Sequence, residues 1–325
     1  MVRELNMIDA LREALTEEMR RDPRVIILGE DVGIQGGIYR VTQGLLAEFG
    51  QERVRDTPIS EEGFMGAALG AAITGLRPVV EIMYADFVAN CMNQIVNFAA
   101  KMRYSSGGQL RVPIVVRSMV GHGRGHGGDH SQVPMTWFMN VPGLKIVVPA
   151  TPYDAKGLLK TAIRDDSPSL FFEPHILYRT KGEVPEEEFT LPFGKADVKR
   201  KGNDVTIVAI SAMVPRALES HDKLREEGIS AEVIDPLTLR PLDVDTIVGS
   251  VKKTNRLVTV EYSPKTGGIG AEISALVIER AFDYLDAPIV RVAAPDVPIP
   301  VSPPLEKMTV PSVESIVEAV KSIVA

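Results

Sequence analysis

Two adjacent carboxylates, Glu61 and Glu62, stand directly before a run of small and apolar residues in the stretch "RDTPISEEGFMGAALGAAITG" (55–75). Ser60 is a favourable N-cap and acids in the first turn interact well with the helix dipole, so capping of a helix is one interpretation. The glycines that follow destabilise a helix, by about 1 kcal/mol each relative to alanine, and are typical of places where another backbone or a flat ligand comes close. Burial at the head of such a helix would raise the pKa of a carboxyl group and suit it to proton transfer. Glu61 is therefore a candidate acid or base.

A loop rich in histidine and glycine, "MVGHGRGHGGDHSQVP" (119–134), is the second candidate for chemistry. Its chemically active side chains are His122, Arg124, His126, Asp129 and His130. The histidines are four residues apart, which suits metal ligands on a helix, but a glycine-rich loop does not preorganise ligands well. A flexible surface loop and a mobile active-site loop that brings a histidine and the arginine to a substrate are the other interpretations. His130 is the best candidate for proton transfer, because it ends the glycine run and leads into "SQVP".

Two further features carry less information. "TGGIGAEI" (266–273) is similar to a phosphate-binding loop but lacks the third glycine of the dinucleotide fingerprint, so a tight turn into a closely packed helix is the simpler interpretation. Tyr84 and Phe87 flank the turn after a predicted strand, where they either pack in the core or lie against a flat ligand.

The elements that must position these residues alternate between short apolar strands and longer amphipathic helices. In the first part of the chain, strands are predicted at 24–31, 77–84, 112–118, 144–150 and 169–174, and helices at 7–21, 87–104 and 152–166. Continuous apolar strands between helices indicate a parallel sheet covered on both faces, whose ligands lie beyond the carboxyl ends of the strands. The charged stretch 179–204 interrupts the pattern, which then resumes to the C-terminus. The sequence thus predicts an α/β protein with two domains, 1–180 and 201–325, joined by a linker at 181–200.

Composition argues against several classes of function. The 325 residues are 45% hydrophobic and 24% charged, as in an ordinary globular protein with two domains. A net charge of −7 and an aromatic content of 6% argue against a nucleic-acid surface. No run approaches the roughly 18 apolar residues of a membrane span, and the N-terminus lacks the apolar core of a secretory signal. The single cysteine, Cys91, excludes an intrachain disulfide, which is typical of a reducing compartment. Together these features lead us to expect a cytoplasmic protein that binds neither membrane nor nucleic acid.

Taken in order, several stretches resemble one known family along almost the whole chain, the β subunits of the thiamine-diphosphate-dependent 2-oxo acid dehydrogenases. They are "GEDV" (29–32), "DTPISEEGF" (56–64), "MYADF" (83–87), "QIVNFAAKMRYSSGG" (94–108), "DHSQ" (129–132), "PGLKIVVPATPYDAKGLLKTAIRDDSP" (142–168), "IDPLTLRPLD" (234–243) and "GGIGAE" (267–272). The resemblance implies a parallel-sheet, pyrimidine-binding domain of the transketolase type, followed by a smaller α/β domain of the transketolase C-terminal type. It also implies oxidative decarboxylation of pyruvate or a branched-chain 2-oxo acid and reductive acylation of a lipoyl group.

The resemblance assigns roles to the matching residues. Glu61 would hydrogen-bond a ring nitrogen of the cofactor's aminopyrimidine and exchange a proton there. Phe87 would pack against the aminopyrimidine, and Ile59 and Glu30, from the "ISE" and "GED" stretches, are the other cofactor-binding residues that we expect. His130 would act in reductive acylation or hold the substrate carboxylate.

A structural potassium ion is also implied by the resemblance. Its ligands match backbone carbonyl groups of Ile114, Ala162 and Ile163 and the side chain of Asp165. Ser167 stands where the family has an asparagine, and this departure weakens the case for the ion.

The chain contains no Gly-Asp-Gly, with which the motif that holds Mg²⁺ and diphosphate begins in thiamine-diphosphate enzymes. The resemblance therefore implies a separate α subunit that supplies the metal and diphosphate site in an α2β2 heterotetramer, with a lipoyl-bearing acyltransferase core as a further partner. Three alternatives stay open: an acetoin dehydrogenase β subunit, a self-sufficient transferase of the transketolase type, and a non-catalytic scaffold subunit. The missing motif argues against the transferase, and the presence of Glu61 and His130 argues against the scaffold.

Overall fold

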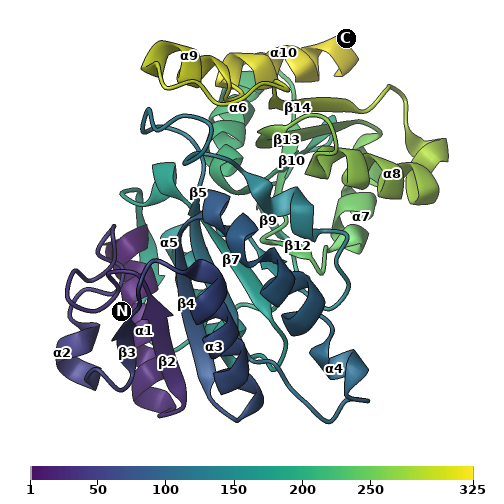
Figure 1. Cartoon of the computed structure of the whole chain (residues 1–325). Coiled ribbons are helices and arrows are strands. Elements are labelled where there is room, and N and C mark those ends of the chain that lie inside the picture. The colour runs from purple at the N-terminus through teal and green to yellow at the C-terminus, as the bar shows by residue number, and fades with distance from the viewer. Residues whose placement is uncertain (1, 325) are drawn as a thin grey trace. The chain divides into compact units, whose positions relative to one another are not determined.

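The computed structural model describes residues 2–324, which form two compact units (Figure 1). The first unit contains the described residues up to Val120 together with Trp137–Phe193, and the second contains Gly121–Thr136 and the residues from Gly194 onward. The predicted boundaries, 1–180 and 201–325, therefore differ from the structure in one segment. The loop 121–136 was predicted to belong to the first domain, but it lies in the second unit. The predicted linker 181–200 also contains two strands, β8 (Lys181–Pro185) and β9 (Asp197–Arg200).

The first unit is built on a parallel sheet with the strand order β6-β7-β5-β4-β2-β3 (Figure 1). The strands are β2 (Val25–Gly29), β3 (Val54–Asp56), β4 (Arg77–Tyr84), β5 (Val115–Val120), β6 (Lys145–Val147) and β7 (Ser169–Pro174). Strands β2, β5 and β7 are buried along their whole length, as their continuous apolar sequences predict. A separate antiparallel pair joins β1 (Val2–Asn6) to β8. The predicted α/β class with a parallel sheet is confirmed.

Helix α1 (Met7–Arg21) packs against α5 (Pro152–Arg164), and α3 (Glu61–Ile73) packs on β4. The contact between α1 and α5 contains two buried lysines, Lys156 and Lys160, whose ammonium groups both pair with Glu17. Such buried cations are tolerated because they are paired. The remaining helical segments of this unit are α2 (Leu45–Phe49), α4 (Met102–Ser105) and a 3₁₀ turn, His175–Leu177; a further 3₁₀ turn, Pro134–Phe138, spans the division between the units.

The helix predicted at 87–104 is not continuous. A 3₁₀ segment (Ala85–Cys91) is followed by a π-helical segment (Asn93–Ala99) and then by α4. The buried residues explain the change. Ala85, Val88 and Cys91 are three residues apart, the repeat of a 3₁₀ helix, whereas Cys91, Ile95 and Ala99 are four apart. The chain therefore changes its winding so that successive turns keep facing the core.

The second unit has a five-stranded sheet with the order β14-β13-β10-β11-β9, in which β9 runs antiparallel to β11. The elements after β9 are β10 (Val205–Ala209), α6 (Val214–Glu226), β11 (Ala231–Asp235), β12 (Thr238–Arg240), α7 (Val244–Thr254), β13 (Leu257–Pro264), α8 (Ile269–Ala281), β14 (Val290–Ala294), α9 (Pro303–Met308) and α10 (Val313–Val324), with short 3₁₀ turns at Ser211–Met213 and Phe282–Tyr284. Helix α10 packs against α6, and α7 packs against α8. Within residues 2–324, no helix has both the length and the apolar character needed to cross a bilayer.

Candidate active site

Three neighbouring strands of the first unit end side by side and lead directly into the predicted site residues. Strand β2 lies between β4 and β3, and Gly29 at its end pairs with Asp56 of β3. The backbone N–H of Thr57, just beyond β3, donates to the carbonyl of Gly29 at 3.0 Å. The residues that follow these strands, Glu30 and the segment from Thr57 to Glu61, therefore meet at the carboxyl edge of the sheet, where ligands of parallel sheets bind.

Glu61 is the first residue of α3 and is only 9% exposed. Among the described residues 2–324, nothing donates a hydrogen bond to its carboxylate or pairs with it as a cation. Ser60 makes no side-chain hydrogen bond to the start of the helix, so the capping interpretation of this segment is wrong for Ser60. The neighbouring Glu62 differs, because it is exposed and accepts a hydrogen bond from the Gln94 amide at 3.1 Å. Glu61 thus presents a mostly buried carboxylate whose oxygens are available to a ligand.

Glu30 lies within the electrostatic reach of Glu61. Burial raises the pKa of Glu30, and the negative charge of Glu61, followed by that of Asp31, raises it further. Its Oε1 is buried without a hydrogen-bond partner, and so is the hydroxyl of Thr57. Buried polar atoms are nearly always hydrogen-bonded, so these two atoms are available to polar groups of a bound molecule.

Apolar and thiol groups complete this edge. Phe87 is half-buried, and its ring packs edge-on against Tyr84 with 5.7 Å between centroids. Ile59 is 84% exposed on the loop before α3. Cys91 is fully buried, and burial, reinforced by the charge of Glu61, raises the pKa of its thiol to about 12. A flat, partly apolar ligand would find an aromatic face and an exposed aliphatic side chain beside two carboxyl groups.

His130, the second predicted catalytic residue, lies in the second unit. Its imidazole is 37% exposed, and its Nδ1 lies 3.2 Å from the Asp129 carboxylate. His122 is buried and neither ring nitrogen has a hydrogen-bond partner; burial lowers its pKa to about 4. Within the part of the chain that the structure describes, no group of three or more His, Cys, Asp or Glu side chains is placed to hold a metal ion.

The glycine-rich turn before α8 is occupied by a side chain of the protein itself. The buried carboxylate of Glu261 accepts hydrogen bonds from the N–H groups of Ile269 and Gly270, both at 2.8 Å. A β-carbon added to Gly268 or Gly270 would meet this carboxylate at 2.6 and 3.0 Å. The turn is therefore a closely packed helix start, as the simpler interpretation of "TGGIGAEI" predicts.

The predicted potassium ligands lie close together, but most already have partners. The carbonyl of Ile114 accepts from the Ser169 N–H at 2.9 Å, and the carbonyl of Ile163 accepts from the Arg77 guanidinium at 3.0 Å. The Asp165 carboxylate pairs with Lys145 and accepts from the Ser167 N–H at 2.8 Å. Ala162 is a buried residue of α5. The Ile163 carbonyl is hydrogen-bonded by Arg77 and the Asp165 carboxylate is paired with Lys145. Because these two cations already occupy the predicted ligand oxygens, this arrangement does not fit a potassium ion.

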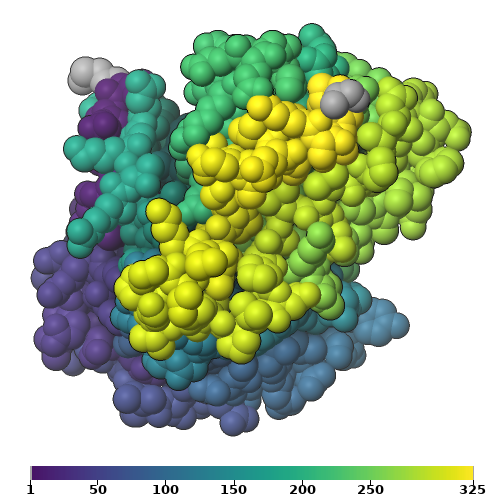
Figure 2. All heavy atoms as spheres, turned by 90° about the horizontal axis from the view of Figure 1, so that it is seen from above, coloured from purple at the N-terminus to yellow at the C-terminus, as the bar shows by residue number. Residues whose placement is uncertain are grey.

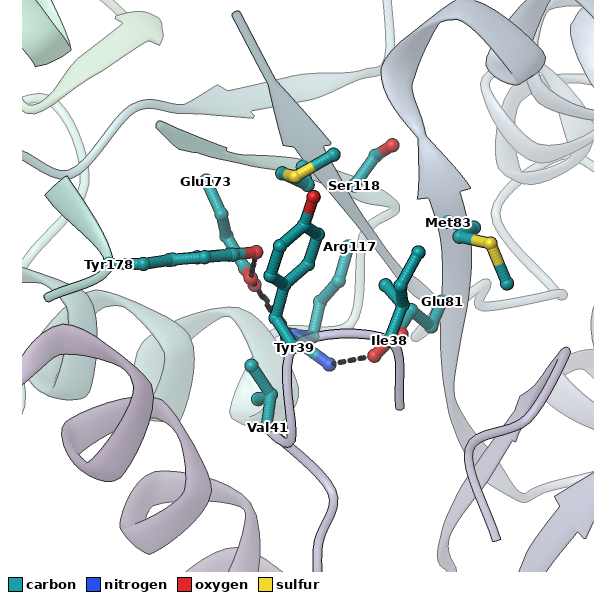
Figure 3. A pocket seen from close by; sticks show the side chains of 10 residues that line it. Ile38, Tyr39, Val41, Glu81, Met83, Arg117, Ser118, Glu173 and Tyr178 are labelled. Atoms are coloured by element: carbon teal, nitrogen blue, oxygen red, sulfur yellow. Dashed lines mark hydrogen bonds and ion pairs between the residues drawn. The ribbon is translucent and has the colours of Figure 1, made fainter. Parts of the chain in front are cut away.

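The first unit contains a buried ionic cluster that was not predicted from the sequence (Figure 3). Arg117 on β5 donates two hydrogen bonds to Glu173 on β7, at 2.7 and 2.9 Å, and one to Glu81 on β4, at 2.9 Å. The Tyr178 hydroxyl donates to Glu173 at 2.8 Å. Figure 3 shows Tyr39 and Ile38 beside this cluster, around a small hollow. The signal was present in the sequence, because each of these three charges interrupts an apolar strand.

Comparison with known proteins agrees with the two-domain fold. Residues 3–181 match the family model "Transketolase, pyrimidine binding domain", and residues 194–316 match "Transketolase, C-terminal domain". A solved structure described as "Split gene transketolase, inactive beta4 tetramer" superposes with a TM-score of 0.82 over 98% of both chains; at 24% identity it shows the fold alone. The chain is thus a transketolase-like α/β protein.

Relatives narrow the class further. The chain is 49% identical to the acetoin:2,6-dichlorophenolindophenol oxidoreductase subunit beta of Bacillus subtilis (strain 168), over 98% of this chain and 96% of that protein. It is 52% identical to the pyruvate dehydrogenase E1 component subunit beta of Gracilaria tenuistipitata var. liui, over 99% of both chains. It belongs to the family of β subunits of the 2-oxo acid and acetoin dehydrogenases, which depend on thiamine diphosphate.

Proposed function

We propose that this chain is the β subunit of the first component of a 2-oxo acid dehydrogenase complex and works with an α subunit in an α2β2 heterotetramer. Together they would decarboxylate pyruvate or a branched-chain 2-oxo acid and acylate a lipoyl group on an acyltransferase core. One observation carries the proposal: Glu61 is a mostly buried carboxylate without an internal partner, beside Glu30, in a chain about half identical to such β subunits.

The residues at this edge of the sheet fit the aminopyrimidine half of thiamine diphosphate. When bound, the cofactor supplies a carbon nucleophile and an electron sink for decarboxylation. The Glu61 carboxyl group would hydrogen-bond a ring nitrogen and move a proton between its Oε atom and that nitrogen. The unmet Oε1 of Glu30 would accept a second hydrogen bond, and Phe87 would lie against the ring.

The metal and diphosphate half of the cofactor would be held by the partner. The chain has no Gly-Asp-Gly, and the described residues offer no acidic or histidine cluster for Mg²⁺. An α subunit that supplies both is therefore part of the proposal, and no potassium ion is. His130, whose exposed imidazole is held by Asp129, would transfer a proton during reductive acylation or hold the substrate carboxylate.

The test compares two neighbouring glutamates in the assembled α/β enzyme. Glu61→Gln keeps the size of the side chain but removes its acid–base function, and should lower kcat by about 10²- to 10⁴-fold. Glu62→Gln is the matched control, because Glu62 is exposed and an amide can still accept from Gln94. It should keep nearly the full rate. Normal turnover by Glu61→Gln would refute the assignment.

An acetoin dehydrogenase β subunit is the second candidate, favoured by the 49% identity to the B. subtilis protein. The two candidates differ in what the assembled enzyme consumes and in whether CO₂ is released. Assays of the reconstituted α/β pair with pyruvate, branched-chain 2-oxo acids and acetoin would separate them: turnover of acetoin without CO₂ would select the second.

A further inference from the structure

The loop 121–130 owes its shape to its glycines. Gly121, Gly123, Gly125 and Gly127 all have φ between +64° and +100°, which side-chain-bearing residues rarely adopt. When such glycines alternate with ordinary residues, successive backbone N–H groups point into one concavity, a nest that binds an anion. The loop is therefore built to receive a negative charge.

The anion in this nest is the carboxylate of Glu306, from α9. Its Oε1 accepts from the Gly123 N–H at 2.8 Å, with the Arg124 N–H at 3.4 Å, and its Oε2 accepts from the Gly125 N–H at 3.0 Å. Glu306 is only 4% exposed, although α9 lies in the yellow C-terminal segment that is visible on the surface in Figure 2. Hydrogen bonds from N–H groups to a carboxylate are stronger than those between neutral groups.

The same segment of the second unit packs closely on the rest of the loop. A β-carbon on Gly127 would lie 2.9 Å from the Val301 side chain, and one on Gly125 would lie 3.0 Å from the Val301 carbonyl. The Arg124 guanidinium donates to the carbonyl of Gly121 at 3.4 Å and also to that of His130. One carboxylate thus fixes residues 123–125, and Arg124 passes this constraint to the backbone of His130.

We propose that Glu306 is a positioning residue for the reaction: it clamps the loop 121–130 through its backbone N–H groups and thereby sets the place of His130. The inference rests on the proposed function for the role of His130, whereas the clamp itself rests on the hydrogen bonds alone. Glu306 touches no reacting atom and acts through the loop.

The clamp is tested by hydrogen exchange, followed by mass spectrometry, in the assembled α/β enzyme. Glu306→Ala should speed exchange in the peptide 119–134 and leave exchange in the rest of the second unit unchanged. Glu306→Gln, which keeps the shape and one acceptor oxygen, should give an intermediate effect. Glu318→Ala, at an exposed position of α10, is the matched control and should exchange like the wild type. Unchanged exchange in the loop of Glu306→Ala would overturn the clamp.

Positioning is tested by a double-mutant cycle with His130→Gln. Glu306→Ala alone should lower kcat for lipoyl acylation by about 10- to 100-fold, since a displaced catalytic group costs that much. In the His130→Gln background it should lower kcat no further, because it acts through His130. Equal losses in both backgrounds would overturn the positioning role. Full activity of His130→Gln by itself would instead refute the proposed function of His130, and the exchange experiment would still report on the clamp.

Discussion

Replacement of Arg117 by methionine should be among the most destabilising single changes in the first unit. The side chains of Arg117 and Glu173 are 2% and 1% exposed, and that of Glu81 is 11% exposed. Although burial opposes the charged form of Arg117, the neighbouring Glu173 and Glu81 raise its pKa, so the guanidinium stays charged. Its removal leaves two carboxylates buried without a cation, and breaking a buried ion pair in this way costs about 3–5 kcal/mol.

The cost should depend on pH in a defined direction. Burial already raises the pKa of Glu81 in the presence of Arg117, and loss of the arginine would raise it further. An acid with a raised pKa in the folded state binds more protons when folded than when unfolded, so stability falls as the pH rises through that pKa. Arg117→Met should therefore be less destabilised at pH 5 than at pH 8.

Urea unfolding followed by tryptophan fluorescence measures this cost, because Trp137 is the only tryptophan and lies in the first unit. Arg111→Met is the matched control: the Arg111 side chain is 68% exposed and pairs with Asp166 at the surface, so its loss should cost less than about 1 kcal/mol. Equal urea midpoints for the two variants, or a cost that is the same at pH 5 and pH 8, would refute the reasoning.

Two further predictions concern single buried groups. Burial lowers the pKa of His122 to about 4 from 6.5, so only the unfolded chain protonates it between these values. Stability should fall as the pH drops through this window, by on the order of 3 kcal/mol at 1.36 kcal/mol per pH unit, and His122→Leu should flatten that slope in urea unfolding followed by circular dichroism. An unchanged slope would show that another group is responsible. Cys91, whose pKa is raised to about 12 from 9.0, holds roughly 1,000-fold less thiolate at pH 8 than an ordinary cysteine, so a maleimide should label it only after unfolding. Rapid labelling of the folded protein would contradict its burial.

Much of the fold was predictable because it depends on local patterns. The α/β class, the strands at 77–84 and 169–174 and the helix at 7–21 agree with the structure, since unbroken apolar runs and helical periodicity are written in neighbouring residues. The continuous helix at 87–104 was wrong, because the core here demands a spacing of three and then four, which amphipathic periodicity alone does not distinguish.

The residues along the chain were enough to predict that Glu61 begins a helix of small residues after a strand, because both features are local. The groups that meet across the chain became known from the folded structure. Glu306 is 183 residues from the Gly123 amide that it accepts from, and Glu173 is 56 residues from Arg117. Local sequence cannot specify such pairs, because a buried charge is satisfied by whichever partner the packing of strands and loops brings within hydrogen-bonding distance.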